Sequence, residues 1–136
     1  MSERAVRTYS VAEANAALEE VAPLVARIVA LFQDIPELQE GVQIANYKTS
    51  REDAGPDLET RYEEAKRAQY DAEMELARSA AQLESRGVVL KDPQQGLIDF
   101  YSVREGELVE LCWKLGEAKI THWHRIGEGF SGRQPL

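Results

Sequence analysis

The amino-acid sequence predicts an α+β domain in which a long antiparallel helical hairpin is followed by a small three-stranded antiparallel β-meander. Three observations support this prediction. In two long segments before Gly87, apolar residues recur in alternating steps of three and four, the spacing of a helical seam. After Gly87 the apolar period becomes two, as in half-buried strands. Helices that precede the strands, instead of alternating with them, indicate the α+β class.

The first helix is expected to begin at Ser10, because Ser10 and Glu13 have the form of a capping box. Pro23 lies off the apolar seam of this helix. Since proline removes a backbone donor, we expect it to kink the helix or to divide it into residues 11–21 and 23–34. The seam itself consists of Val11, Ala14, Leu18, Val21, Val25, Ile28, Phe32 and Ile35.

The second helix is expected to end at Gly87, which suits the residue after a helix C-terminus. Its seam is similar in length to the first, so the two helices are predicted to pack antiparallel between residues 10 and 86. Residues 36–56 would connect them, which is long for a helix–helix connection. The connector is either a flexible insertion, which its mixed polarity favours, or a segment that lies on the hairpin through Val42, Ile44 and Tyr47. The second seam consists of Leu58, Tyr62, Ala65, Gln69, Ala72, Leu76, Ser79 and Leu83.

Strands are predicted at residues 97–103, 107–113 and 119–126, after a turn at 92–96. If Glu105-Gly106 is a two-residue turn, the numbers of opposite residues in the first two strands sum to 211. One face of this pair is then wholly apolar and should face the core. The other face has Asp99 opposite Cys112 and Tyr101 opposite Glu110, and the apolar face has Ile98, Phe100, Val109, Leu111 and Trp113.

The register of the third strand has two alternatives. A turn limited to Gly116-Glu117 places His122 opposite Leu111 and turns both histidines into the apolar face. One more turn residue places His122 opposite Cys112 and His124 opposite Glu110, with Trp123 in the core. We favour the second register, because buried imidazoles need hydrogen-bond partners.

Length and composition fit one globular domain over residues 1–136, with the β-meander and a C-terminal tail in 88–136. The net charge of −8 and the pI near 4.8 disfavour nucleic-acid binding. Cys112 is the only cysteine, which excludes an internal disulfide and fits a reducing compartment. No apolar run is long enough to cross a membrane, and the N-terminal residues lack the apolar region of a signal peptide. We therefore expect a cytoplasmic protein.

The chemistry of this chain is expected near its two histidines. In the second register, one sheet face gathers nitrogen, sulfur and oxygen donors suited to zinc or a similar metal ion: Asp99, Glu110, Cys112, His122 and His124. Two histidines with one residue between them are also common on solvated sheet faces. A single cysteine is more often a small buried apolar residue than a ligand. The spacing alone is therefore not specific.

The glycine-rich tail is the second candidate site. Three glycines in six residues allow backbone amides to converge, and Arg133 is able to bind a carboxylate or phosphate through two hydrogen bonds. The alternative, which we favour, is a turn in which Phe130 fills the core and Arg133 pairs with an acidic side chain.

Several segments resemble the bacterial family known as domain of unknown function 2203: S-V-A-E-A-N-A-A-L at the start, G-V-V-L-K-D-P-Q-Q-G-L-I-D-F, and L-C-W-K-L-G-E to G-F-S-G-R-Q-P-L at the end. The resemblance implies a cytosolic protein with no agreed activity, in a family with some members labelled as possible metal-binding proteins. His122 departs from the family pattern, which shifts weight to His124 with Glu117 and Asp99. The matching positions are Glu13, Asn15, Asp99, Trp113, Gly116, Glu117, Trp123, His124, Gly129, Phe130, Gly132 and Arg133.

The leading hypothesis is a small cytoplasmic protein that binds a divalent transition metal, zinc above all, in its C-terminal β-region. If the protein is an enzyme, metal-assisted hydrolysis is the natural class. The alternative is a non-catalytic interaction or oligomerisation module built on the hairpin, with structural histidines and a homodimer as its assembly. The predicted ligands are His124, His122, Asp99 and Glu117, with Glu128, Arg133, Cys112 and Glu110 as further site residues.

Overall fold

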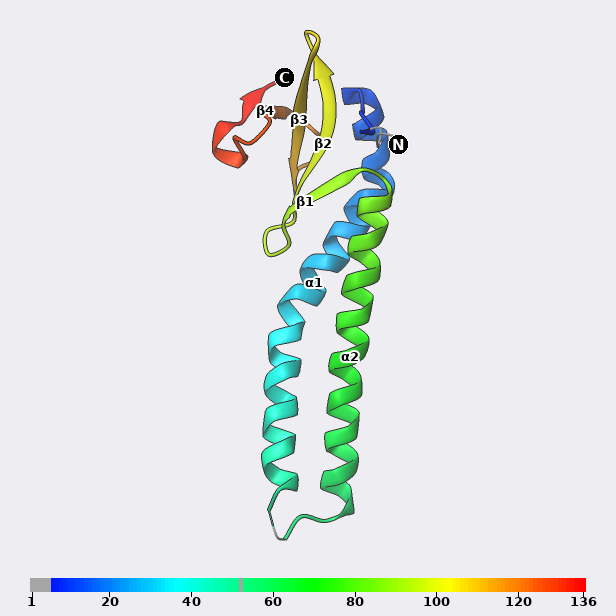
Figure 1. Ribbon diagram of the computed structural model, residues 1–136, viewed down its shortest axis with the longest axis vertical. Helices are drawn as coiled ribbons and strands as arrows, with labels where there is room; N and C mark the ends of the chain where they lie inside the picture. Colours follow the sequence, from blue (N-terminus) through cyan, green and yellow to red (C-terminus); the bar gives the residue numbers. More distant parts are fainter. Residues whose placement is uncertain (1–5, 52) are drawn as a thin grey trace, which may run out of the picture.

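In a computed structural model, which describes residues 6–51 and 53–136, a helical hairpin carries an antiparallel sheet at one end (Figure 1). The predicted fold class is confirmed, but the sheet has five strands where three were predicted. The helices are α1 (Val11–Thr49) and α2 (Pro56–Ser85). The strands are β1 (Val88–Asp92), β2 (Leu97–Arg104), β3 (Glu107–Lys114), β4 (His122–Arg125) and β5 (Gln134–Pro135), and a short 3-10 helix η1 (Phe130–Gly132) precedes β5.

Helix α1 begins at the predicted capping box. The Glu13 amide donates to Ser10 Oγ over 3.0 Å, and the Ser10 amide donates to Glu13 Oε1 over 2.9 Å. The helix is not divided at Pro23. It also continues through Pro36 to Thr49, so the predicted connector at 36–56 was wrong and the connection begins only at Ser50. Both prolines are exposed on the outer side of the helix.

The predicted seams hold the two helices together. In α2 every predicted seam residue is buried or half-buried. In α1 the seam is buried from Ala14 to Ile28, but Val11 and Phe32 are 37% and 40% exposed, and Leu31 is buried in place of Phe32. Gly87 follows α2 with a φ of +74°, which confirms its predicted role at the helix end.

The sheet has the strand order β1-β2-β3-β4-β5, with every neighbouring pair antiparallel. Opposite residues of β2 and β3 sum to 211, from Leu97 with Lys114 to Arg104 with Glu107, as predicted. In β4, His122 lies opposite Cys112, which is the second of the two predicted registers. Strand β4 is shorter than the predicted 119–126, since pairing with β3 begins only at His122.

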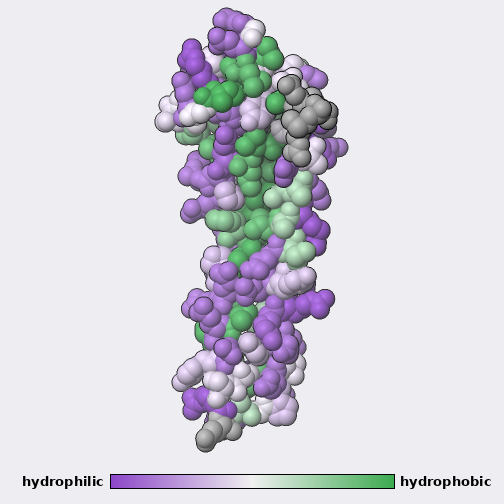
Figure 2. Space-filling model, viewed as in Figure 1, coloured by the Kyte–Doolittle hydropathy of each residue, from purple (hydrophilic) through white to green (hydrophobic). Residues whose placement is uncertain are grey.

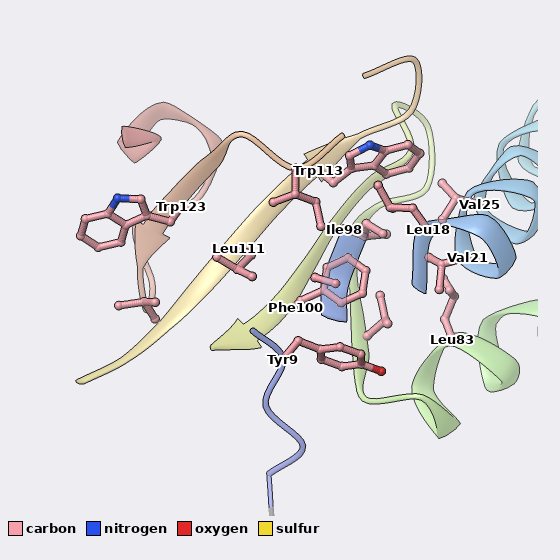
Figure 3. Close-up of a cluster of buried hydrophobic side chains, with 14 of the residues drawn as sticks. Tyr9, Leu18, Val21, Val25, Leu83, Ile98, Phe100, Leu111, Trp113 and Trp123 are labelled. Carbon is pink, nitrogen blue, oxygen red and sulfur yellow. The ribbon is translucent and has the colours of Figure 1, made fainter. Parts of the chain in front are cut away.

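The core lies between one sheet face and the end of the hairpin nearest the sheet (Figure 3). Val21 and Val25 of α1, Leu83 of α2 and Phe100 of β2 belong to one buried cluster, and each of these side chains is at most 1% exposed. Burial of such a side chain stabilises the fold by about 1.5–3 kcal/mol. Trp123 is 9% exposed and belongs to this core, as the second register requires.

Farther from the sheet, α1 and α2 pack on each other through their apolar seams. Figure 2 shows apolar residues gathered along the part of the hairpin near the sheet, and mostly hydrophilic residues farther from it. A bidentate ion pair joins the helices on the outside, with both Arg27–Glu75 distances at 2.7 Å. Neither described helix is long and apolar enough to cross a membrane.

Candidate metal centre

The candidate site lies on the sheet face that points away from the helices. Strand pairing places Asp99, Cys112 and His122 in one row across β2, β3 and β4, and Glu110 and His124 in the next row. Residues opposite each other in an antiparallel sheet project to the same face. Three strands therefore bring the candidate donors to one surface, as the second register predicted.

Asp99, Cys112 and His124 lie close enough to share one ion. One donor atom of each residue lies within 4.8 Å of the other two, and each residue is at most 1% exposed. We call these three residues the Asp–Cys–His group. It offers one oxygen, one sulfur and one nitrogen donor, and all three side chains are shielded from solvent.

Hydrogen bonds orient the imidazole of His124. Its Nδ1 lies 2.9 Å from the carbonyl oxygen of Arg125, and its Nε2 lies 3.1 Å from Oδ1 of Asp99. A carbonyl oxygen only accepts, so Nδ1 must donate and carry a proton. The contact between Nε2 and Asp99 then requires one further proton, on either the imidazole or the carboxyl group. A metal ion bound at Nε2 would replace that proton.

Two carboxyl groups at this face keep oxygens without hydrogen bonds. Within the described residues, Oδ2 of Asp99 and Oε2 of Glu110 are buried and accept no hydrogen bond. Lys91 of β1 supplies the nearest cation, with its Nζ 3.7 Å from that Asp99 oxygen and 3.3 Å from that Glu110 oxygen. The pKa of Asp99 is raised to about 6, chiefly by burial; His124 opposes this rise and Glu110 adds to it. The two carboxyl groups therefore share one nearby ammonium group, that of Lys91, and each keeps a buried oxygen without a hydrogen bond.

Cys112 is a thiol in this environment. Its pKa is raised to about 12, chiefly by burial and then by the charge of Asp99, whereas Arg133 opposes the rise. A thiol binds zinc as the thiolate, so a metal ion must displace the proton. Any affinity of the site should consequently depend on pH.

Glu117 does not join the Asp–Cys–His group, although the sequence analysis placed it among the ligands. Arg133 Nη2 donates to both Glu117 carboxylate oxygens, over 2.7 and 2.9 Å, and the Lys114 amide donates over 2.7 Å. Burial raises the pKa of Glu117, but Arg133 and the Lys114 amide outweigh it and lower the pKa overall. The pairing of Arg133 with an acidic side chain follows the favoured prediction for the tail.

The other predicted site residues lie around the group. His122 is half-buried, and its Nδ1 lies 2.9 Å from the hydroxyl of Thr121. Glu128 is exposed and packs its side chain against Gly132. Phe130 is 44% exposed, so the prediction that it fills the core was wrong, and its ring instead stacks under the guanidinium of Arg133 at 4.6 Å.

Sequence reasoning missed Lys91, because residues 88–92 were not predicted to form a strand. The run Val88-Val89-Leu90 directly before the turn at Asp92 was the available signal. Pairing of Val89 with Asp99 brings β1 beside the group, and Lys91 lies two residues farther along β1.

A family model described as “Uncharacterized conserved protein (DUF2203)” matches residues 7–136. The match covers both helices, all five strands and the whole Asp–Cys–His group. Neither the curated proteins nor the solved structures include a match to the chain. The description of this family assigns no activity to it.

Proposed function

The chain belongs to the uncharacterised conserved protein family DUF2203, and we propose that it binds one divalent transition metal ion, zinc above all, through Asp99, Cys112 and His124. The single observation that carries this proposal is the convergence of three donor atoms from three adjacent strands within 4.8 Å. A set of one nitrogen, one sulfur and one oxygen donor suits zinc, which accepts all three.

The distances require little rearrangement. Ligand atoms of a tetrahedral zinc ion lie about 3.3–3.7 Å apart, given bonds of about 2.0–2.3 Å. The Nε2–Oδ1 distance of 3.1 Å is already close to that range. The sulfur has at most about 1 Å to move, which a change in the side-chain torsion of Cys112 provides.

Lys91 is the cation that a metal ion would displace. Its ammonium group neutralises the same carboxyl groups, and its side chain is 37% exposed, so it is free to move into solvent. Glu110 then keeps a buried oxygen without a hydrogen bond beside the ion. That oxygen is suited to be a fourth ligand or a base for a bound water.

Three protein ligands leave a fourth position on zinc, as catalytic zinc sites do. If the protein turns over a substrate, this position would activate water for hydrolysis. The chain has one cysteine, and a reducing compartment such as the cytoplasm would keep it available as a ligand.

The test is metal content after zinc supplementation, measured by mass spectrometry on protein purified without a histidine tag. Wild type is expected to hold about one zinc ion per chain, and His124→Ala is expected to lose it. His122→Ala is the matched control, because His122 lies on the same strand but outside the group. Zinc well below one ion per chain in wild type, or equal loss in both variants, would contradict the proposal.

A second candidate function is an interaction or homodimerisation module built on the hairpin. Five large apolar side chains of the hairpin are between 40% and 66% exposed: Phe32, Ile44, Tyr47, Tyr70 and Met74. Surface side chains of this size favour contact with a partner when they adjoin one another. Sedimentation equilibrium tests this candidate: a dimer that Tyr70→Lys and Met74→Lys together dissociate supports it, and a wild-type monomer contradicts it.

A further inference from the structure

We propose that the end of the hairpin farthest from the sheet holds a second binding site, which takes a small amphipathic carboxylate such as a medium-chain fatty acid. The site is a pocket of about 260 Å³ between α1 and α2. Its walls are apolar, formed by Ile44 and Ala45 of α1 and by Leu58 and Ala65 of α2. The volume lies just below the range of about 300–1,000 Å³ for drug-sized ligands, so a short apolar chain fits it.

Two cations line the same pocket. Lys48 comes from the last turn of α1 and Arg61 from the second turn of α2, and both are exposed. Neither belongs to an ion pair within residues 6–51 and 53–136, whereas Lys66 and Arg67 nearby pair with Glu63 and Asp71. In a protein with a net charge of −8, two cations that pair with no carboxylate among the described residues are complementary to an anion at this apolar pocket. The planar guanidinium of Arg61 matches a carboxylate in particular.

The glycine at position 41 also supports a binding site at this pocket. It lies inside α1, where glycine is about 1 kcal/mol less favourable than alanine. A Cβ at this position would meet no atom within 4 Å, so packing of the fold does not require glycine. Gly41 lines the pocket, and the absent side chain leaves its volume open. A ligand that occupies this volume accounts for a residue that weakens the helix.

The proposal is independent of the metal centre. The sheet lies at one end of the molecule, and residues 41–51 and 53–65 lie at the other (Figure 1). No residue of the Asp–Cys–His group lines the pocket. Failure of zinc binding would leave the second site unaffected, and the reverse also holds.

Octanoate is the probe, titrated into the full chain below its micelle concentration by isothermal calorimetry. We expect one octanoate per chain, with at least tenfold weaker binding of octan-1-ol and of octylammonium, which lack the anionic head. Vesicles of an anionic phospholipid form a second arm of the experiment. Binding to the vesicles without binding of free octanoate would overturn the proposal in favour of a membrane lipid.

Gly41→Leu is the decisive variant, because leucine fills the pocket and is a better helix former than glycine. We expect it to abolish octanoate binding without lowering the melting temperature, so that unfolding is not the cause of the loss. Arg61→Glu is expected to weaken binding at least tenfold. Arg67→Glu is its matched control on the same helix, outside the pocket, and should bind as wild type does. Unchanged binding in Gly41→Leu, or equal losses in the two arginine variants, would overturn the proposal.

Discussion

Nε2 of His124 lies 3.1 Å from Oδ1 of Asp99, although the two residues belong to strands that β3 separates. Strands β2 and β4 are about 9.5 Å apart, since neighbouring strands are about 4.8 Å apart. The two side chains therefore reach toward each other across β3, where Cys112 lies between their strands. This contact encloses the thiol and brings the three donors together.

Asp99→Asn is expected to change how stability depends on pH in the metal-free protein. The pKa of Asp99 is raised from 3.8 to about 6, so between these values the folded protein holds a proton that the unfolded chain has released. The free energy of unfolding of wild type should then fall by about 2 kcal/mol as the pH rises from about 4 to 6, with a slope of at most about 1.36 kcal/mol per pH unit. Asparagine does not ionise, so this contribution disappears.

Urea unfolding with a chelator present, at intervals from pH 4 to 7, measures this difference. The variant should gain stability relative to wild type as the pH rises. Asp71→Asn is the control, because Asp71 is exposed and its ion pair with Arg67 is on the surface. A constant difference between Asp99→Asn and wild type at every pH would show that Asp99 has an ordinary pKa.

Zinc affinity is expected to increase with pH, because zinc must displace the proton of Cys112. The pKa of this thiol is raised to about 12, so it is protonated throughout the neutral range. Each displaced proton makes the apparent affinity rise about tenfold per pH unit. Competition with a chromophoric chelator at pH 6, 7 and 8 measures the slope. Affinity that does not change with pH would mean that the thiol is not a ligand.

Arg133→Met is expected to destabilise the fold by about 1–3 kcal/mol, because both oxygens of the Glu117 carboxylate lose the hydrogen bond that Arg133 Nη2 donates. The side chains of Arg133 and Glu117 are only 13% and 27% exposed, so water replaces this pair poorly. Arg67→Met breaks an exposed pair and should change stability by less than about 0.5 kcal/mol. Chemical denaturation compares the two variants, and equal effects would show that the tail is not held by this ion pair.

Gly96→Ala is expected to be among the most destabilising single changes, at about 3 kcal/mol or more. Gly96 has a φ of +71°, and an added Cβ would lie 2.7 Å from the Cβ of Leu115 and 3.1 Å from Val29 of α1. Gly106→Ala is the matched control, since Gly106 has a φ of +78° but open space around it. The control should lose only about 1 kcal/mol, and the difference between their melting curves reports the packing of the β1–β2 turn against Leu115 and α1. Similar losses would show that this turn is not closely packed against Leu115 and α1.

Local patterns in the sequence predicted much of the fold. The α2 seam, the capping box at Ser10 and the pairing of β2 with β3 follow from spacing and turn chemistry within short segments. The register of β4 followed from one physical argument, that Trp123 buries more favourably than two imidazoles without partners. Each of these features depends on residues that are close in the sequence, so the spacing of residue types predicts it.

The errors have a common cause in tertiary packing. Pro36 was taken as a helix end, yet α1 continues because Leu38, Val42 and Ala45 keep the seam spacing and pack half-buried along the hairpin. That packing offsets the roughly 3 kcal/mol that a proline costs inside a helix. Strand β5 has only two residues, which no periodicity detects.

The candidate site was predicted in part. Asp99 and His124 were expected as ligands, and Cys112 was a further candidate that strand register now brings into the same group. Glu117 looked equally suitable as a ligand in the sequence, but its partner Arg133 is 16 residues away and is determined by the path of the tail. The sequence predicted an acidic partner for Arg133 but did not identify Glu117 as that partner, because the choice depends on the fold.

Cobalt(II) substitution tests the metal hypothesis most directly, because a thiolate bound to cobalt produces a charge-transfer band in the near ultraviolet. We predict that wild type and His122→Ala show this band at one cobalt ion per chain, and that Cys112→Ser and His124→Ala lose it. Cobalt that binds wild type without the band, or a band that persists in Cys112→Ser, would contradict a metal centre formed by Asp99, Cys112 and His124.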